Sequence, residues 1–165
     1  MPEANPQIAA AAASRTVDLK QSQDWFLSRY EAWLERRIAN QSLVLDQDPR
    51  AVVLVYSKLF AARGLISAGD YEAQLTRCHT LMDSFAALAP KWCNVILTAS
   101  DEVLLRRIHQ RGAPAFDDAT MKEIFAGFRA LSMSLKLHSP ASCIEFDSSA
   151  MAVEDILRSL RVKAI

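Results

Sequence analysis

The chain has 165 residues, and its 19 basic and 19 acidic side chains leave a formal net charge of zero. This length suits one domain with a real core, and the charge balance provides no overall field to hold a nucleic acid polymer or an anionic membrane. No apolar run approaches the ~20 residues that span a bilayer, and residues 1–14 contain Glu3 and no basic side chain, unlike a secretory signal.

Cysteine and histidine usage indicates a reduced protein without a metal site. Cys78, Cys93 and Cys143 are odd in number and far apart in the sequence, which is typical of small core residues in a cytosolic protein. The three histidines lack the spacing of metal ligands. We therefore expect a cytoplasmic protein whose cysteines are reduced and buried.

The N-terminal part predicts a flexible segment followed by a long helix. Residues 1–16 contain two prolines and an alanine run, and we expect them to be flexible. Residues 17–40 then show a helical apolar pattern, with Gln23 and Arg29 beside it. The apolar positions are Phe26, Leu27, Tyr30, Trp33, Leu34 and Ile38.

A strand and two helices are expected next. The apolar run 42–46 predicts a strand that ends in Asp46, and ligands of α/β folds bind beyond such carboxyl ends. Asp48 is a good helix cap before Pro49, and Gly64 can terminate that helix. Ser67 begins a capping motif for a further helix to about residue 88.

Residues 94–112 carry the most informative pattern. A β-branched strand, 94–98, is followed by a helix that Ser100 caps and Gly112 stops. Arg106, Arg107 and Arg111 gather near its C-terminus. They are either solvated side chains that complement the helix dipole, or guanidinium groups aimed at phosphate oxygens.

The C-terminal part adds a helix from about residue 117, a third strand at 142–146 before Asp147, and a last helix at 151–161. Three apolar strands that alternate with helices predict an α/β fold. We expect a three-layer parallel sheet covered by helices on both faces, in a single domain over residues 1–165.

The order of these motifs resembles the deoxynucleoside kinases and the thymidylate-kinase-like enzymes, which are P-loop phosphotransferases. Gln23, with Phe26, Leu27 and Arg29, is similar to the family's helix whose glutamine binds the nucleobase. Arg107-Ile108 and Arg111-Gly112 resemble the R-I-x-x-R-G lid, whose arginines hold ATP phosphates. The strand before Asp147 resembles the family's terminal strand.

The resemblance also implies roles for residues nearer the N-terminus. Glu3, before Asn5-Pro6, would be the base towards the nucleoside hydroxyl, and Asp46 would belong to the family's catalytic Asp-Arg pair. Gln47 follows Asp46, so Arg50 is the candidate substitute for the missing arginine in nucleoside binding. ATP and Mg²⁺ would be the cofactors, and a nucleoside or nucleotide the substrate.

One departure from the family changes the expectation. The sequence contains no G-x-x-x-x-G-K-[ST], the loop that cradles phosphates and supplies the Mg²⁺-binding hydroxyl. We therefore expect a kinase-like fold without its first strands, from a truncated or degenerate gene, and inactive alone. The alternatives are a non-catalytic remnant that binds partners, as a homodimer or with a chain that completes its sheet, and an unrelated α/β domain.

Overall fold

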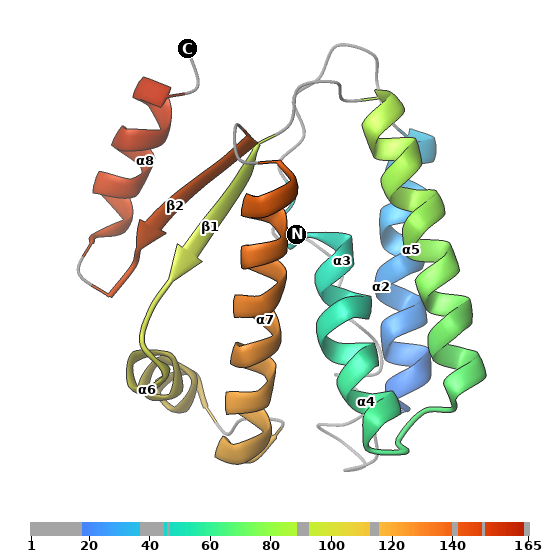
Figure 1. Ribbon diagram of the computed structural model, residues 1–165. Coiled ribbons are helices and arrows are strands. Elements are labelled where there is room, and N and C mark those ends of the chain that lie inside the picture. The colour runs from blue at the N-terminus through green and yellow to red at the C-terminus, as the bar shows by residue number, and fades with distance from the viewer. Residues whose placement is uncertain are drawn as a thin grey trace. The chain divides into compact units, whose positions relative to one another are not determined.

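The computed structural model describes residues 18–36, 45, 47–88, 93–112, 116–139, 142–149 and 151–163. The chain groups into two compact units, Met1–Pro90 and Lys91–Ile165, and each is considered by itself. Figure 1 shows the helices and strands of both units. The expected flexible segment, 1–16, lies outside the described residues, and the prediction of one domain stays a prediction.

The expected three-layer sheet is wrong. The described residues are mostly helical, and they contain one parallel sheet of two strands, β1 and β2. Of the predicted strand at 42–46, only Leu45 is described, and it has no regular structure. The physical reason is that the long amphipathic helices of unit 1 bury their apolar faces against one another, so its core needs no sheet.

The described residues of unit 1 form three helical segments. α2 (Leu19–Arg36) and α5 (Ala68–Leu88) run side by side in Figure 1, and the segment between them packs against both. That segment is α3 (Pro49–Ala51), the π-helix η1 (Val52–Ser57) and α4 (Lys58–Ala62). The buried apolar side chains include Leu27, Tyr30, Val52, Val53, Phe60, Cys78, Leu81 and Phe85.

The helix caps of unit 1 lie where the sequence predicts them, but the sequence did not predict its π-helix. The Asp48 side chain accepts a hydrogen bond from the backbone N–H of Arg50, and Ser67 Oγ accepts one from that of Asp70 at 3.0 Å, as predicted. Inside the middle segment, the fully buried Ser57 donates its hydroxyl to the carbonyl of Val52, five residues earlier, at 3.1 Å. The apolar spacing predicted a regular α-helix there, because apolar periodicity cannot reveal a single widened turn.

Unit 2 contains the sheet. β1 (Asn94–Thr98) pairs in parallel with β2 (Cys143–Asp147), and the register runs from Asn94 opposite Cys143 to Thr98 opposite Asp147. This confirms that the two strands are parallel neighbours, although β2 lies one residue later than predicted. The helices α6 (Asp101–Arg111) and α7 (Asp118–His138) connect them, and α8 (Val153–Lys163) follows.

The ends of α6 and α7 also match the sequence. Ser100 Oγ accepts from the N–H of Val103 at 3.4 Å, and Asp117 accepts from that of Thr120 at 2.7 Å. Gly112 follows α6 with a φ of 128°, a conformation that side chains rarely adopt. None of the described helices is long and apolar enough to cross a membrane.

The cysteines are free, but not all are core residues. Cys78 is buried in unit 1, and burial raises the pKa of its thiol to about 11. Cys143 is partly exposed, and Cys93, which precedes β1, is exposed. The expectation of three buried cysteines is therefore wrong for Cys93, since a position just before a strand need not enter the core.

Candidate functional site

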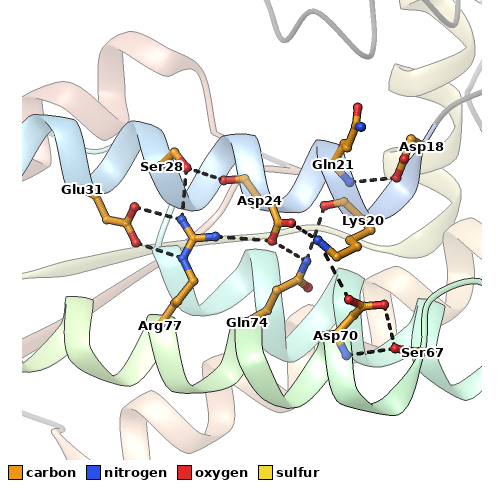
Figure 2. Close-up of polar contacts among 10 residues, drawn as sticks. All are labelled: Asp18, Lys20, Gln21, Asp24, Ser28, Glu31, Ser67, Asp70, Gln74 and Arg77. Carbon is orange, nitrogen blue, oxygen red and sulfur yellow. Dashed lines mark hydrogen bonds and ion pairs between the residues drawn. The ribbon is translucent and has the colours of Figure 1, made fainter.

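Polar side chains of α2 and α5 form a connected network, which Figure 2 shows in close-up. The members from α2 recur at three- or four-residue intervals and so form one stripe along the helix. We call the following set the α2–α5 network: Lys20, Asp24, Ser28 and Glu31 from α2, with Asp70, Gln74 and Arg77 from α5.

Asp24 is the centre of the network. Its Oδ2 accepts a hydrogen bond from Lys20 Nζ at 2.6 Å, and its Oδ1 accepts from Gln74 Nε2 at 2.9 Å and from Arg77 Nη1 at 3.4 Å. Burial by itself would raise the pKa of this carboxyl group. The hydrogen bonds from Lys20 and Gln74, with the positive charges of Lys20 and Arg77, outweigh burial and lower the pKa. Asp24 is therefore held ionised.

Arg77 extends the network along α2. Its guanidinium donates two hydrogen bonds to the Glu31 carboxylate, at 3.0 and 2.9 Å, and one to Ser28 Oγ at 3.1 Å. The hydrogen bond with Glu31 is the main reason that the pKa of Arg77 is raised. Such a fork restrains the direction as well as the distance between the two side chains, and it links α2 to α5.

Two glutamines of unit 1 are buried with an unsatisfied oxygen. Gln74 is 1% exposed and Gln23 is 6% exposed, and the Oε1 atom of each accepts no hydrogen bond. A buried acceptor without a partner costs about 1–3 kcal/mol of stability. Each of the two oxygens therefore lacks the hydrogen bond that a buried acceptor usually has.

Gln23 and Arg50 are the two predicted site residues that the structure describes in unit 1. Gln23 points into the core from α2, where the sequence alone gave no reason to expect a buried glutamine. Arg50 donates from Nε to both carboxylate oxygens of Asp48, at 2.9 and 3.1 Å. The Tyr30 hydroxyl donates to the carbonyl of Gln47 at 2.8 Å and so ties α2 to the segment just before α3.

Two other predicted site residues, Glu3 and Asp46, lie outside the described residues. Their expected catalytic roles therefore stay predictions.

The predicted phosphate-binding arginines lie on α6 in unit 2. Arg107 donates to the hydroxyl of Ser148 at 3.0 Å and to its carbonyl at 2.6 Å. Ser148 in turn donates its backbone N–H and its hydroxyl to the carbonyl of Thr98, at 2.8 and 2.9 Å. Arg107 thus lies where both strands end. Arg111 is four residues further on the same helical face and is exposed, as is Arg106.

The described residues do not form a cradle for a triphosphate. Arg107 already uses two of its donors on Ser148, and Arg111 is a single exposed cation. Among the described side chains, no three of His, Cys, Asp and Glu gather as a metal site would require.

Comparison with protein-family models, with curated proteins and with solved structures finds no match to this chain. The resemblance to nucleoside kinases therefore depends on the sequence motifs alone.

Sequence reasoning missed Gln74, Arg77 and Ser148. Gln74 had a visible signal, because it precedes Cys78 by four residues and interrupts the apolar stripe that continues through Leu81. Arg77 and Ser148 had none, since their partners are 46 and 41 residues away in the sequence.

Proposed function

We propose that this chain is a nucleoside-kinase-like protein that binds a nucleoside or nucleotide through Gln23 and, by itself, transfers no phosphoryl group. The observation that supports it best is the buried Oε1 of Gln23, which has no hydrogen-bond partner. Nucleobases present N–H groups on their edges, and a side-chain amide offers a matching acceptor and donor pair. The resemblance to nucleoside kinases also implies that a glutamine at this point of the chain binds the nucleobase.

The physical setting of Gln23 favours a specific contact. A hydrogen bond is stronger in a buried environment than in water, and an unmade one is costly there. A base that satisfied Gln23 Oε1 would thus gain affinity, and a base that presented only acceptors to it would be rejected. Arg50, at the start of α3, is the candidate second contact to the nucleoside in unit 1.

The proposed lack of activity has a chemical reason. Phosphoryl transfer depends almost entirely on positioning and on stabilising negative charge, and the sequence has no phosphate loop to do this for ATP and Mg²⁺. In an intact kinase of the family that the chain resembles, Glu3 would be the base and Asp46 would belong to the catalytic Asp-Arg pair. Arg107 and Arg111 would hold the ATP phosphates. Without a phosphate loop, such residues would not complete the reaction.

Nucleoside binding tests the proposal directly. Thymidine, deoxycytidine, deoxyadenosine and deoxyguanosine would each be titrated into the full chain by calorimetry. At least one should bind, and Gln23→Leu should weaken it about tenfold or more, because a buried polar contact is lost. Gln21→Leu, at an exposed position of the same helix, is the matched control and should leave the affinity unchanged. Equal affinities for wild type and Gln23→Leu would refute the role of Gln23.

A transfer assay tests the absence of catalysis. With radiolabelled ATP, Mg²⁺ and each nucleoside, the purified chain should yield no labelled nucleotide above background. A nucleoside-dependent product that disappears in Glu3→Gln would contradict this part of the proposal.

A second candidate function is a non-catalytic module that binds another protein chain. The observation that favours it is on β1, where Val95 and Leu97 share one face of the strand and are 43% and 58% exposed. A second copy or a partner strand could cover them. Under either function we place the protein in the cytoplasm, because its three cysteines are free thiols.

A further inference from the structure

Helix α2 has two adjacent stripes that face different surroundings. The first is its share of the α2–α5 network, centred on Asp24. The second consists of Gln23, Leu27 and Tyr30, all buried. Because successive residues of a helix are about 100° apart, the direction of Gln23 is set by the direction of its neighbour Asp24. Whatever holds Asp24 against α5 therefore also decides where Gln23 points.

Gln74 is the member of the network that lies deepest. It is 1% exposed, whereas the side chains of Lys20, Asp24 and Arg77 are 46%, 27% and 34% exposed. Its Nε2 lies 2.9 Å from Asp24 Oδ1 and 3.4 Å from the carbonyl of Lys20, so it contacts α2 through both a side chain and the backbone. Ion pairs at exposed positions are weak and mobile, and a buried hydrogen bond is less so.

The amide oxygen of Gln74 indicates that a glutamine stands here for a reason other than stability. Its Oε1 is buried without a hydrogen-bond partner. An apolar residue of similar length, such as methionine, would fill the same volume without an unsatisfied oxygen. The amide of Gln74 therefore adds little to the stability of the fold. Its contribution is a hydrogen-bond donor directed at Asp24.

We propose that Gln74 is a positioning residue, which holds Asp24 against α5 and so fixes the rotation of α2 that turns Gln23 inward. It contacts no ligand itself. The hydrogen bond from Tyr30 to the carbonyl of Gln47 restrains the same buried stripe of α2, two turns beyond Gln23. Where it concerns nucleoside affinity, this inference rests on the function proposed above.

Gln74→Met in the full chain tests the proposal, with Thr80→Val, at an exposed position of the same helix, as control. The melting temperature should stay within a few degrees of wild type, because the loss of the hydrogen bonds to Asp24 and to the carbonyl of Lys20 is offset by the loss of a buried unsatisfied oxygen. The side-chain amide resonances of Gln23 in ¹H–¹⁵N spectra should shift and broaden, and the affinity for the bound nucleoside should fall about tenfold. Thr80→Val should change neither.

Exchanging the amide of Gln74 with the carboxylate of Asp24 tests the positioning role by rescue. A residue that only fills space would show no rescue of the affinity. Gln74→Glu places a second carboxylate against Asp24, so the Gln23 resonances should move and affinity should fall. Adding Asp24→Asn restores the pair with the two groups exchanged: position 24 now carries the amide donor and position 74 the carboxylate. Lys20 and Arg77 again face a negative charge. The double variant should recover most of the affinity and of the wild-type Gln23 resonances.

The outcomes separate this inference from the proposed function. If Gln74→Met leaves the Gln23 resonances at their wild-type positions, Gln74 does not position α2 and the inference is overturned. If Gln74→Met unfolds the chain, the double variant decides, and a failure to recover the Gln23 resonances overturns it. If those resonances respond as expected while wild type binds none of the four nucleosides, the positioning role stands and the proposed function fails.

Discussion

Arg107 binds Ser148 through two hydrogen bonds, one to its hydroxyl at 3.0 Å and one to its carbonyl at 2.6 Å. Since Ser148 also bonds the carbonyl of Thr98, this contact joins α6 to the ends of both strands. The residue that the kinase resemblance assigns to ATP phosphates thus already has a structural task. A phosphate at this point would have to bind the remaining donors of Arg107 or displace Ser148.

The structural task of Arg107 can be measured by replacement. Arg107→Met removes both hydrogen bonds and should lower the local stability of the β2 end by about 1.5–3 kcal/mol, the range for bonds that involve a charged group. Amide hydrogen exchange of Ser148, whose N–H donates to Thr98, reports it directly. Arg106→Met, at an exposed position of the same helix, should leave that exchange rate unchanged. Equal exchange in both variants would show that the contact contributes nothing.

The sequence predicted local structure well and the assembly of the layers poorly. The roles of Ser100 and Gly64 are predicted correctly because a cap or a left-handed turn depends on a few neighbouring residues. The three-layer sheet is wrong because a strand forms only where a distant segment pairs with it, and a short apolar run does not specify that partner. Of the candidate site, Gln23 could be named from a motif, but its burial and its link through Asp24 to Gln74 could not.

Acid should weaken the α2–α5 network through Asp24. Its pKa is lowered in the folded state, so its ionisation stabilises the fold above the pKa of an unfolded aspartate, about 4. That stability is lost as the pH falls through the lower, folded value. Wild type and Asp24→Asn should therefore differ in free energy of unfolding at pH 6, and the difference should shrink below about pH 4. A difference that is constant from pH 2 to 6 would contradict the lowered pKa.

Gly64 and Gly69 differ in backbone conformation, and at neither position would a Cβ be crowded. Gly64 has a φ of 68°, and a Cβ there would meet no atom within 4 Å, so Gly64→Ala acts through the backbone alone. It should lower the free energy of unfolding by about 1–2 kcal/mol. Gly69, in the first turn of α5, has its nearest neighbour, Ser67 Oγ, at 3.9 Å. Gly69→Ala should leave stability unchanged or raise it by up to about 1 kcal/mol. Urea unfolding followed by circular dichroism measures both, and equal losses would refute the assignment of strain to Gly64.

The exposed face of β1 should make the chain self-associate. Among the described residues, β1 pairs with β2 alone, and its sequence, NVILT, contains no charge and no proline, the residues that guard a free edge. Val95 and Leu97 add apolar area on one face of this strand.

We expect a mass by light scattering that rises with protein concentration, and we expect Leu97→Glu to suppress the rise. Leu65→Glu is the matched control, since Leu65 is 54% exposed against 58% for Leu97 but lies in a turn of unit 1 between α4 and α5. A wild-type chain that stays monomeric at every concentration, or an equal effect of Leu65→Glu, would mean that β1 is not the surface on which copies meet.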